Sequence, residues 1–149
     1  MTRDELRNIL VGAWRLVSYK ATDIESGEVV TPFGSRPRGL IMYTADGHMS
    51  AQIMHPERPN FRAGRLEEGL PEELSAAAVG YMAYGGSYEV LEADRVVHHV
   101  KLSLFPNWAG GTQTRVANWD GERLRLILPE PAMIWGARRN GVLTWERAQ

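Results

Sequence analysis

The sequence of 149 residues contains no cysteine. This absence excludes disulfide bonds, thiolate metal ligands and cysteine nucleophiles. The sequence also lacks a run of about 18 apolar residues, the length that a helix needs to cross a membrane. No apolar signal-peptide core follows the first residues. We therefore expect a cytoplasmic protein without a membrane partner.

Neither sign of charge dominates the chain. It has 17 basic and 18 acidic residues, whereas nucleic-acid binding needs a concentrated basic surface. We therefore expect no nucleic-acid partner. The length is typical of one domain, which we place at residues 1–149. A domain of this size buries roughly 70% of the surface of its unfolded chain, which suffices for a core without disulfides or metals.

Strand signals dominate the sequence. Three aspartate-containing tips, at 45–47, 92–94 and 119–121, separate segments in which apolar and polar residues alternate. They predict three hairpins, because Asp-Gly favours the positive φ angles of tight turns. Short strands joined by such turns indicate a mainly β fold, an antiparallel closed β-barrel of about 8–10 strands. The other expected elements are strands at 14–19, 28–30 and 142–147, a short N-terminal helix at 4–10 and one mid-chain helix at about 71–84.

Several short segments of the sequence match motifs of one known protein family. Gly12-Ala13-Trp14 looks like the Gly-x-Trp at the first strand of lipocalins. The longer similar segments are Pro32-Phe33-Gly34, Pro37-Arg38-Gly39, residues 43–52 and Leu104-Phe105-Pro106-Asn107-Trp108. Together these segments resemble the lipocalin-like domain family of bacteria and fungi. The resemblance covers nearly the whole chain and implies a lipocalin-like barrel with a cavity. It supplies no catalytic residues.

The turn positions predict which side chains point into this barrel, because side chains alternate along a strand. Centring one hairpin on Asp120-Gly121 places Gln113, Arg115 and Trp119 on the apolar inner face. Centring another on Ala93-Asp94 pairs Glu89 with His98, also on the inner side.

The faces of the hairpin at 38–55 are both partly apolar, so alternation does not separate them. We place Tyr43, Ser50 and Gln52 toward the lumen. Trp108 lies on a Pro-Asn loop at the expected barrel rim, where a large aromatic side chain either gates a ligand or packs.

Three of these inner residues suggest acid–base chemistry. Glu89 opposite His98 would orient the imidazole and raise its basicity. Arg115 could bind a carboxylate, enolate or phenolate through its planar guanidinium. The alternative is a structural network in which Glu89 and Arg115 neutralise each other beside His98.

Metal binding is not expected. His98 and His99 are adjacent, so on a strand they point to opposite faces. His48 and His55 are also of opposite parity. No motif in the sequence points to a cofactor.

These observations leave three functions open. The first is a barrel, monomeric or homodimeric, that binds a small hydrophobic or polycyclic molecule in its lumen. The second is a cofactor-free isomerase or cyclase of secondary metabolism, in which Glu89, His98 and Arg115 are catalytic. For both of these functions, the expected ligand-binding residues are Tyr43, Ser50, Gln52, Trp108, Gln113 and Trp119. The third is a structural or interaction barrel with a filled core.

Overall fold

The computed structural model of the chain describes residues 1–92 and 94–148. It contains two α-helices, α1 (Arg3–Leu10) and α2 (Pro71–Val79), and two 3₁₀ turns, η1 (Leu66–Glu68) and η2 (Pro106–Trp108). The strands are β1 (Gly12–Asp23), β2 (Val29–Val30), β3 (Arg38–Tyr43), β4 (His48–Met54), β5 (Tyr81–Glu92), β6 (Arg95–Ser103), β7 (Thr112–Trp119), β8 (Arg123–Ile127), β9 (Ala132–Ile134) and β10 (Ala137–Arg147).

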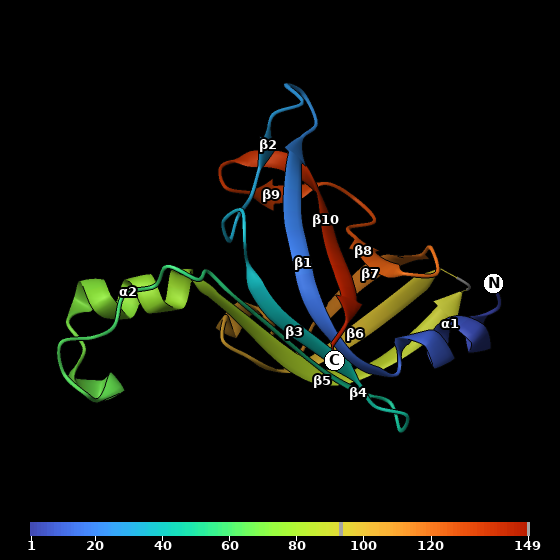
Figure 1. The fold of residues 1–149 in the computed structure, drawn as a ribbon, viewed down its shortest axis with the longest axis horizontal. Coiled ribbons are helices and arrows are strands. Elements are labelled where there is room, and N and C mark those ends of the chain that lie inside the picture. The colour runs from blue at the N-terminus through green and yellow to red at the C-terminus, as the bar shows by residue number, and fades with distance from the viewer. Residues whose placement is uncertain (93, 149) are drawn as a thin grey trace.

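Eight of the described strands close into an antiparallel barrel (Figure 1). They follow one another in the order β1, β3, β4, β5, β6, β7, β8 and β10, and β10 pairs with β1 to complete the ring. The short strand β2 pairs beside the C-terminal end of β1, and the short strand β9 pairs beside the N-terminal end of β10. The predicted closed β-barrel is confirmed.

The closing pair of strands carries the largest core residues. Trp14 of β1 and Trp145 of β10 are both almost completely buried. The register pairs Leu16 with Trp145 and shifts between Leu16 and Ser18, where β1 contains a bulge. Such a bulge increases the local twist of a strand.

The two helices occupy different places (Figure 1). Helix α1 begins with a capping box between Thr2 and Glu5 and buries Leu6 and Leu10 against the barrel. Helix α2 projects from the barrel beside β5 and contains no buried residue. Neither helix is long and apolar enough to span a membrane, and the same holds for every helix among the described residues.

The mid-chain helix is shorter than the 71–84 predicted from the sequence. It ends at Val79, and the chain continues as β5 from Tyr81. The Ala83-Tyr84-Gly85-Gly86 segment pairs with β4, whose residues Ser50 and Ala51 lie opposite Gly85 and Tyr84. Tertiary pairing with β4 therefore replaces the last helical turn.

Candidate ligand-binding site

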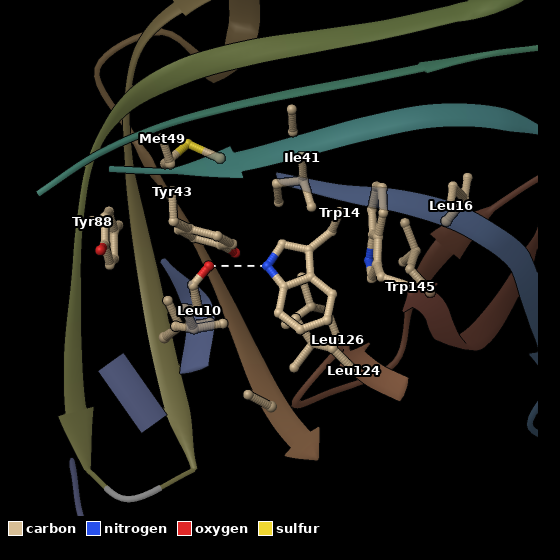
Figure 2. Close-up of a cluster of buried hydrophobic side chains, with 14 of the residues drawn as sticks. Leu10, Trp14, Leu16, Ile41, Tyr43, Met49, Tyr88, Leu124, Leu126 and Trp145 are labelled. Atoms are coloured by element: carbon tan, nitrogen blue, oxygen red, sulfur yellow. Dashed lines mark hydrogen bonds between the residues drawn. The ribbon is translucent and has the colours of Figure 1, made fainter. Parts of the chain in front are cut away.

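Helix α1 closes one end of the barrel, where its Leu10 lies beside Trp14 (Figure 2) and the Arg147 guanidinium stacks on the Trp14 ring. The indole N–H of Trp14 donates to the carbonyl of Leu10 at 2.9 Å. The Arg147 guanidinium lies 3.9 Å from the centre of the Trp14 ring and donates to the carbonyls of Ile9 and Val11. These contacts fix the helix across the barrel end.

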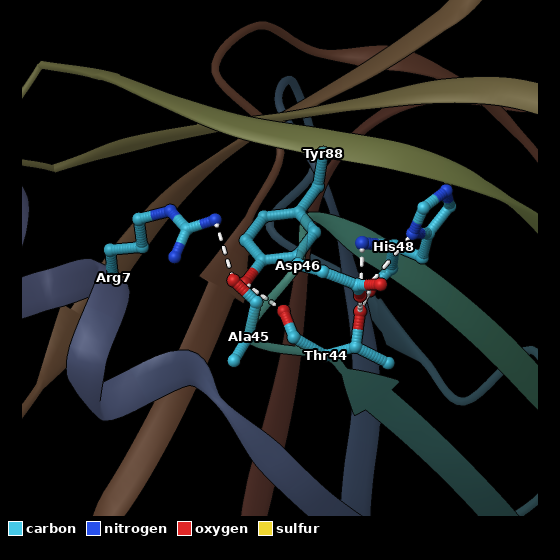
Figure 3. Close-up of polar contacts among 6 residues, drawn as sticks. All are labelled: Arg7, Thr44, Ala45, Asp46, His48 and Tyr88. Atoms are coloured by element: carbon cyan, nitrogen blue, oxygen red, sulfur yellow. Dashed lines mark hydrogen bonds and ion pairs between the residues drawn. The ribbon is translucent and has the colours of Figure 1, made fainter.

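The turn between β3 and β4 is attached to the same end (Figure 3). Arg7 of α1 donates to the carbonyl of Ala45 at 3.1 Å, and the Tyr88 hydroxyl donates to the carbonyl of Thr44 at 2.7 Å. The Arg7 guanidinium also lies over the Tyr88 ring. This end of the barrel is therefore packed rather than open.

A cavity of about 270 Å³ occupies the lumen beyond this packed end. Its walls are mostly apolar and come from both halves of the chain. Polar groups reach it at Tyr19, Tyr84, His98, Gln113 and Arg115. The apolar wall includes Ile41, Ile53, Met82, Leu126, Leu128, Leu143 and Trp145.

A wider mouth of about 540 Å³ adjoins this cavity. Tyr19, Met82, Trp108, Met133 and Ile134 line both spaces. The outer part of the mouth is formed by exposed apolar side chains, which are Val79, Leu104, Phe105 and Trp135. The lumen thus has an apolar entrance at the end opposite α1.

His98 is the central polar group of the lumen, with 1% of its surface exposed. Its Nε2 lies 2.7 Å from the Tyr43 hydroxyl and its Nδ1 lies 2.7 Å from the Tyr84 hydroxyl. Burial lowers the pKa of His98 to about 3, and the charges of Arg115 and His99 add to this effect. The imidazole is therefore neutral at neutral pH.

Burial also controls the two tyrosines. It raises the pKa of the Tyr43 hydroxyl well above its usual value, and the pKa of the Tyr84 hydroxyl in the same direction. Both phenols are therefore protonated beside the neutral His98 ring. The three side chains form a hydrogen-bonded chain without a net charge.

Arg115 brings a positive charge to the cavity wall. Its guanidinium donates to the carbonyl of Thr114 at 2.8 Å and to the side-chain oxygen of Gln113 at 3.3 Å. Within the described part of the chain, no carboxylate forms an ion pair with it, and no acidic residue lines the cavity. The lumen therefore presents positive charge and N–H donors to whatever enters it.

The structure brings several of the predicted residues together. His98, Gln113 and Arg115 line the cavity, and Trp108 lines both the cavity and the mouth. Tyr43 points inward as expected but lies behind His98 and does not line the cavity.

Glu89 is the clearest correction. The sequence predicted that it pairs with His98 on the inner face, but Glu89 pairs with Val97, and Tyr88 pairs with His98. A register irregularity between Val90 and Glu92 shifts the hairpin by one residue, and a shift of one residue turns a side chain to the other face. The Glu89 carboxylate accepts a hydrogen bond from His99 on the outer surface at 2.8 Å. Ala93, on which the predicted turn was centred, lies outside the described residues.

Three further placements differ from the prediction. Ser50 and Gln52 lie on the outer side of β4, because Met49, Ala51 and Ile53 fill the inner side. Gln52 accepts a hydrogen bond from the exposed hydroxyl of Tyr81. Trp119 points inward but packs edge-on against Trp14 at 5.6 Å, within the packed end and away from the cavity.

Sequence reasoning missed Tyr19 and Tyr84 as cavity residues. Tyr84 was assigned to the mid-chain helix, although Met82, Tyr84, Tyr88 and Val90 recur with the two-residue period of a strand. Extending the strand back through Gly85-Gly86 would have placed Tyr84 on the same face as Tyr88. No comparable signal distinguished Tyr19 from the other residues of the long first strand.

Each of three comparisons with known proteins finds a match. A family model described as "Lipocalin-like domain" matches residues 11–148. The 4'-hydroxy-3'-methoxypropiophenone carrier protein of Aspergillus oryzae is 37% identical over 106 residues, which is 66% of this chain and 96% of that protein. A crystal structure of an uncharacterised protein from Bacteroides eggerthii aligns with a TM-score of 0.45 and 14% identity, over 93% of this chain and 99% of the other.

Proposed function

Since this chain belongs to the lipocalin-like domain family, we propose that it carries a small aromatic ketone in the lumen of its barrel. The observation that carries this proposal is the cavity itself. It is apolar, lies inside the barrel beyond a packed end, and adjoins an apolar mouth. Such concave, mostly apolar sites with a few placed polar groups are typical of small-molecule binding.

The size of the lumen favours a compact ligand. At about 270 Å³ it lies near the lower limit of pockets that hold drug-sized molecules, which span roughly 300–1,000 Å³. A ligand with one aromatic ring suits this space better than a large polycyclic one. Any longer substituent would extend into the mouth past Trp108.

The polar groups favour a ligand with oxygen acceptors. Arg115 offers a positive charge without a carboxylate partner in the described chain, and Tyr84 adds a neutral hydroxyl. Burying an unpaired charge is costly, so a phenolate or a carbonyl oxygen beside Arg115 would stabilise the complex. The name of the Aspergillus relative describes a carried molecule with one aromatic ring, a phenolic hydroxyl and a ketone, which is the chemistry that these groups would recognise.

The carrier function fits the lumen better than the alternative of a cofactor-free isomerase or cyclase. General acid–base catalysis works best when the pKa of the catalytic group lies near the working pH. Burial holds the pKa of His98 at about 3, so this imidazole is a weak base and is not an acid at neutral pH. Glu89, the other proposed proton carrier, faces the outer surface.

The direct test is binding of 4'-hydroxy-3'-methoxypropiophenone to the intact protein, measured by calorimetry with native mass spectrometry for stoichiometry. We expect one molecule per chain, recovered chemically unchanged. Arg115→Met should weaken binding roughly ten- to hundredfold, the range for a hydrogen bond to a charged group. The matched control is Lys101→Met, because Lys101 is exposed on the outer side of β6.

Two results would contradict the proposal. One is a protein that binds neither this ketone nor related aryl ketones at millimolar concentration. The other is conversion of the ketone into an isomer or a cyclised product, which would favour the enzyme instead.

A further inference from the structure

Three hydrogen-bonded side chains lead from the packed end of the barrel to the cavity wall. Tyr43 on β3, His98 on β6 and Tyr84 on β5 are joined by two hydrogen bonds of 2.7 Å, one to each imidazole nitrogen. All three side chains are at least 94% buried, since their exposed fractions are 2%, 1% and 6%. His98 and Tyr84 line the cavity, and Tyr43 does not.

The protons shared by Tyr43, His98 and Tyr84 can be counted. A neutral imidazole has one N–H donor and one bare nitrogen acceptor. One tyrosine must therefore donate its hydroxyl proton to His98, and the other must accept the N–H of the ring. The tyrosine that accepts has a hydroxyl proton left to give to a different partner.

The surroundings decide which tyrosine donates to His98. Among the described residues, His98 Nε2 is the only hydrogen-bond partner of the Tyr43 hydroxyl. If Tyr43 accepted from the ring, its own proton would be buried without an acceptor, at a cost of roughly 1–3 kcal/mol. Tyr43 therefore donates to Nε2, and the ring carries its proton on Nδ1.

The consequence appears at the cavity. Nδ1–H of His98 donates to the Tyr84 oxygen, which leaves the Tyr84 O–H without an acceptor in the described chain. We propose that Tyr84 gives this proton to a carbonyl oxygen of the bound molecule, and that Tyr43 and His98 are positioning residues that fix its direction. The inference rests on the proposed function and adds that the lumen distinguishes a ketone from the same molecule without its carbonyl group.

The direction of the hydrogen bonds between Tyr43, His98 and Tyr84 can be tested without a ligand. In a ¹⁵N NMR spectrum of the protein, the protonated and bare nitrogens of an imidazole resonate far apart. We expect His98 to be neutral near pH 7, with the proton on Nδ1, and we expect Tyr43→Phe to shift both nitrogen signals because Nε2 loses its donor. A proton on Nε2, or a charged ring, would overturn the inference.

The ligand part is tested with a pair of compounds, 4'-hydroxy-3'-methoxypropiophenone and the analogue with a methylene group in place of the carbonyl. Tyr84→Phe should weaken binding of the ketone roughly two- to tenfold, the worth of one neutral hydrogen bond, and leave the analogue unchanged. Tyr88→Phe is the matched control, because the Tyr88 hydroxyl bonds the carbonyl of Thr44 outside the cavity.

The outcomes separate this inference from the proposed function. Equal losses for both compounds in Tyr84→Phe, or no loss for either, would overturn the role of Tyr84 while the carrier function stands. A wild-type protein that binds neither compound would overturn the proposed ligand class. The nitrogen spectrum would still decide the direction of the hydrogen-bonded chain.

Discussion

Truncating Trp14 to alanine should remove the main support of the packed barrel end. The side chain is fully buried. It contacts Trp119 edge-on, lies under the Arg147 guanidinium and bonds the carbonyl of Leu10. The substitution would therefore affect the barrel core and the attachment of α1 together (Figure 2).

The magnitude follows from these contacts. Truncation of a buried tryptophan to alanine costs about 3–5 kcal/mol. The lost hydrogen bond contributes about 1 kcal/mol of this, and the lost cation–π contact with Arg147 about 0.5–2 kcal/mol. We expect the upper part of the range for Trp14→Ala. Trp14→Phe keeps a ring under Arg147 and loses the N–H donor, so its loss should be smaller, about 1–2 kcal/mol.

Urea denaturation followed by circular dichroism measures these losses as changes in the free energy of unfolding. Trp135→Ala is the control, because Trp135 is 62% exposed and truncation at a surface position changes stability by only about 0.5 kcal/mol. A loss below about 1 kcal/mol for Trp14→Ala would refute the reasoning. It would mean that Trp14 does not hold α1 to the barrel.

Two further predictions concern the barrel interior. Because the pKa of His98 is about 3 in the fold and near 6.5 when unfolded, its stabilising effect is present above pH 6.5 and is lost as the pH falls toward 3. From this group alone the free energy of unfolding should drop by about 2 kcal/mol between pH 7 and pH 5, and His98→Gln, which does not titrate, should lose that part of the drop. Gly86→Ala should destabilise the barrel by about 1–3 kcal/mol, because a Cβ there would lie 1.9 Å from the carbonyl oxygen of His99. Gly64→Ala is the control. A Cβ at Gly64 would have nothing within 4 Å, so this substitution should be neutral in the same denaturation experiment.

The barrel was predictable because turn signals and alternation agree over most of the chain. Asp120-Gly121 marks a real turn, with Gly121 at a φ of +94°. A hairpin centred on Asp120-Gly121 would pair Trp119 with Glu122, whereas the structure pairs Trp119 with Leu124, two residues further along the chain. A shift of two residues keeps every side chain on its face, so Gln113 and Arg115 were placed correctly in spite of the wrong register.

The second hairpin shows why the site was harder to predict. Its register differs from the prediction by one residue. A shift by an odd number of residues turns each side chain to the opposite face, so Glu89 was assigned to the wrong face. The irregularity between Val90 and Glu92 has no counterpart in the alternation of the sequence. His98 was still placed inside, because its own strand alternates strongly with Val96 and Val100.

In the first hairpin, the alternation of apolar and polar residues was too weak to show which face points inward. Leu40 and Met42 point outward on β3 and are each 40% exposed, so the outer side looks as apolar as a core side. Ser50 and Gln52 were placed on one face with Tyr43, but the structure pairs Tyr43 with Met49, so Tyr43 stays inside while β4 turns Ser50 and Gln52 outward.

The two ends of the barrel differ in how their polar groups are satisfied. At the α1 end, the Trp14 N–H and the Arg147 guanidinium donate to backbone carbonyls, so these donors already have acceptors within the protein. At the cavity, Arg115 and Tyr84 retain donors that no described residue accepts. Groups of the first kind stabilise the fold, and groups of the second kind are available for binding. Under the proposed function, the polar groups that hold α1 to the barrel are therefore distinct from Arg115 and Tyr84, which would contact the ligand.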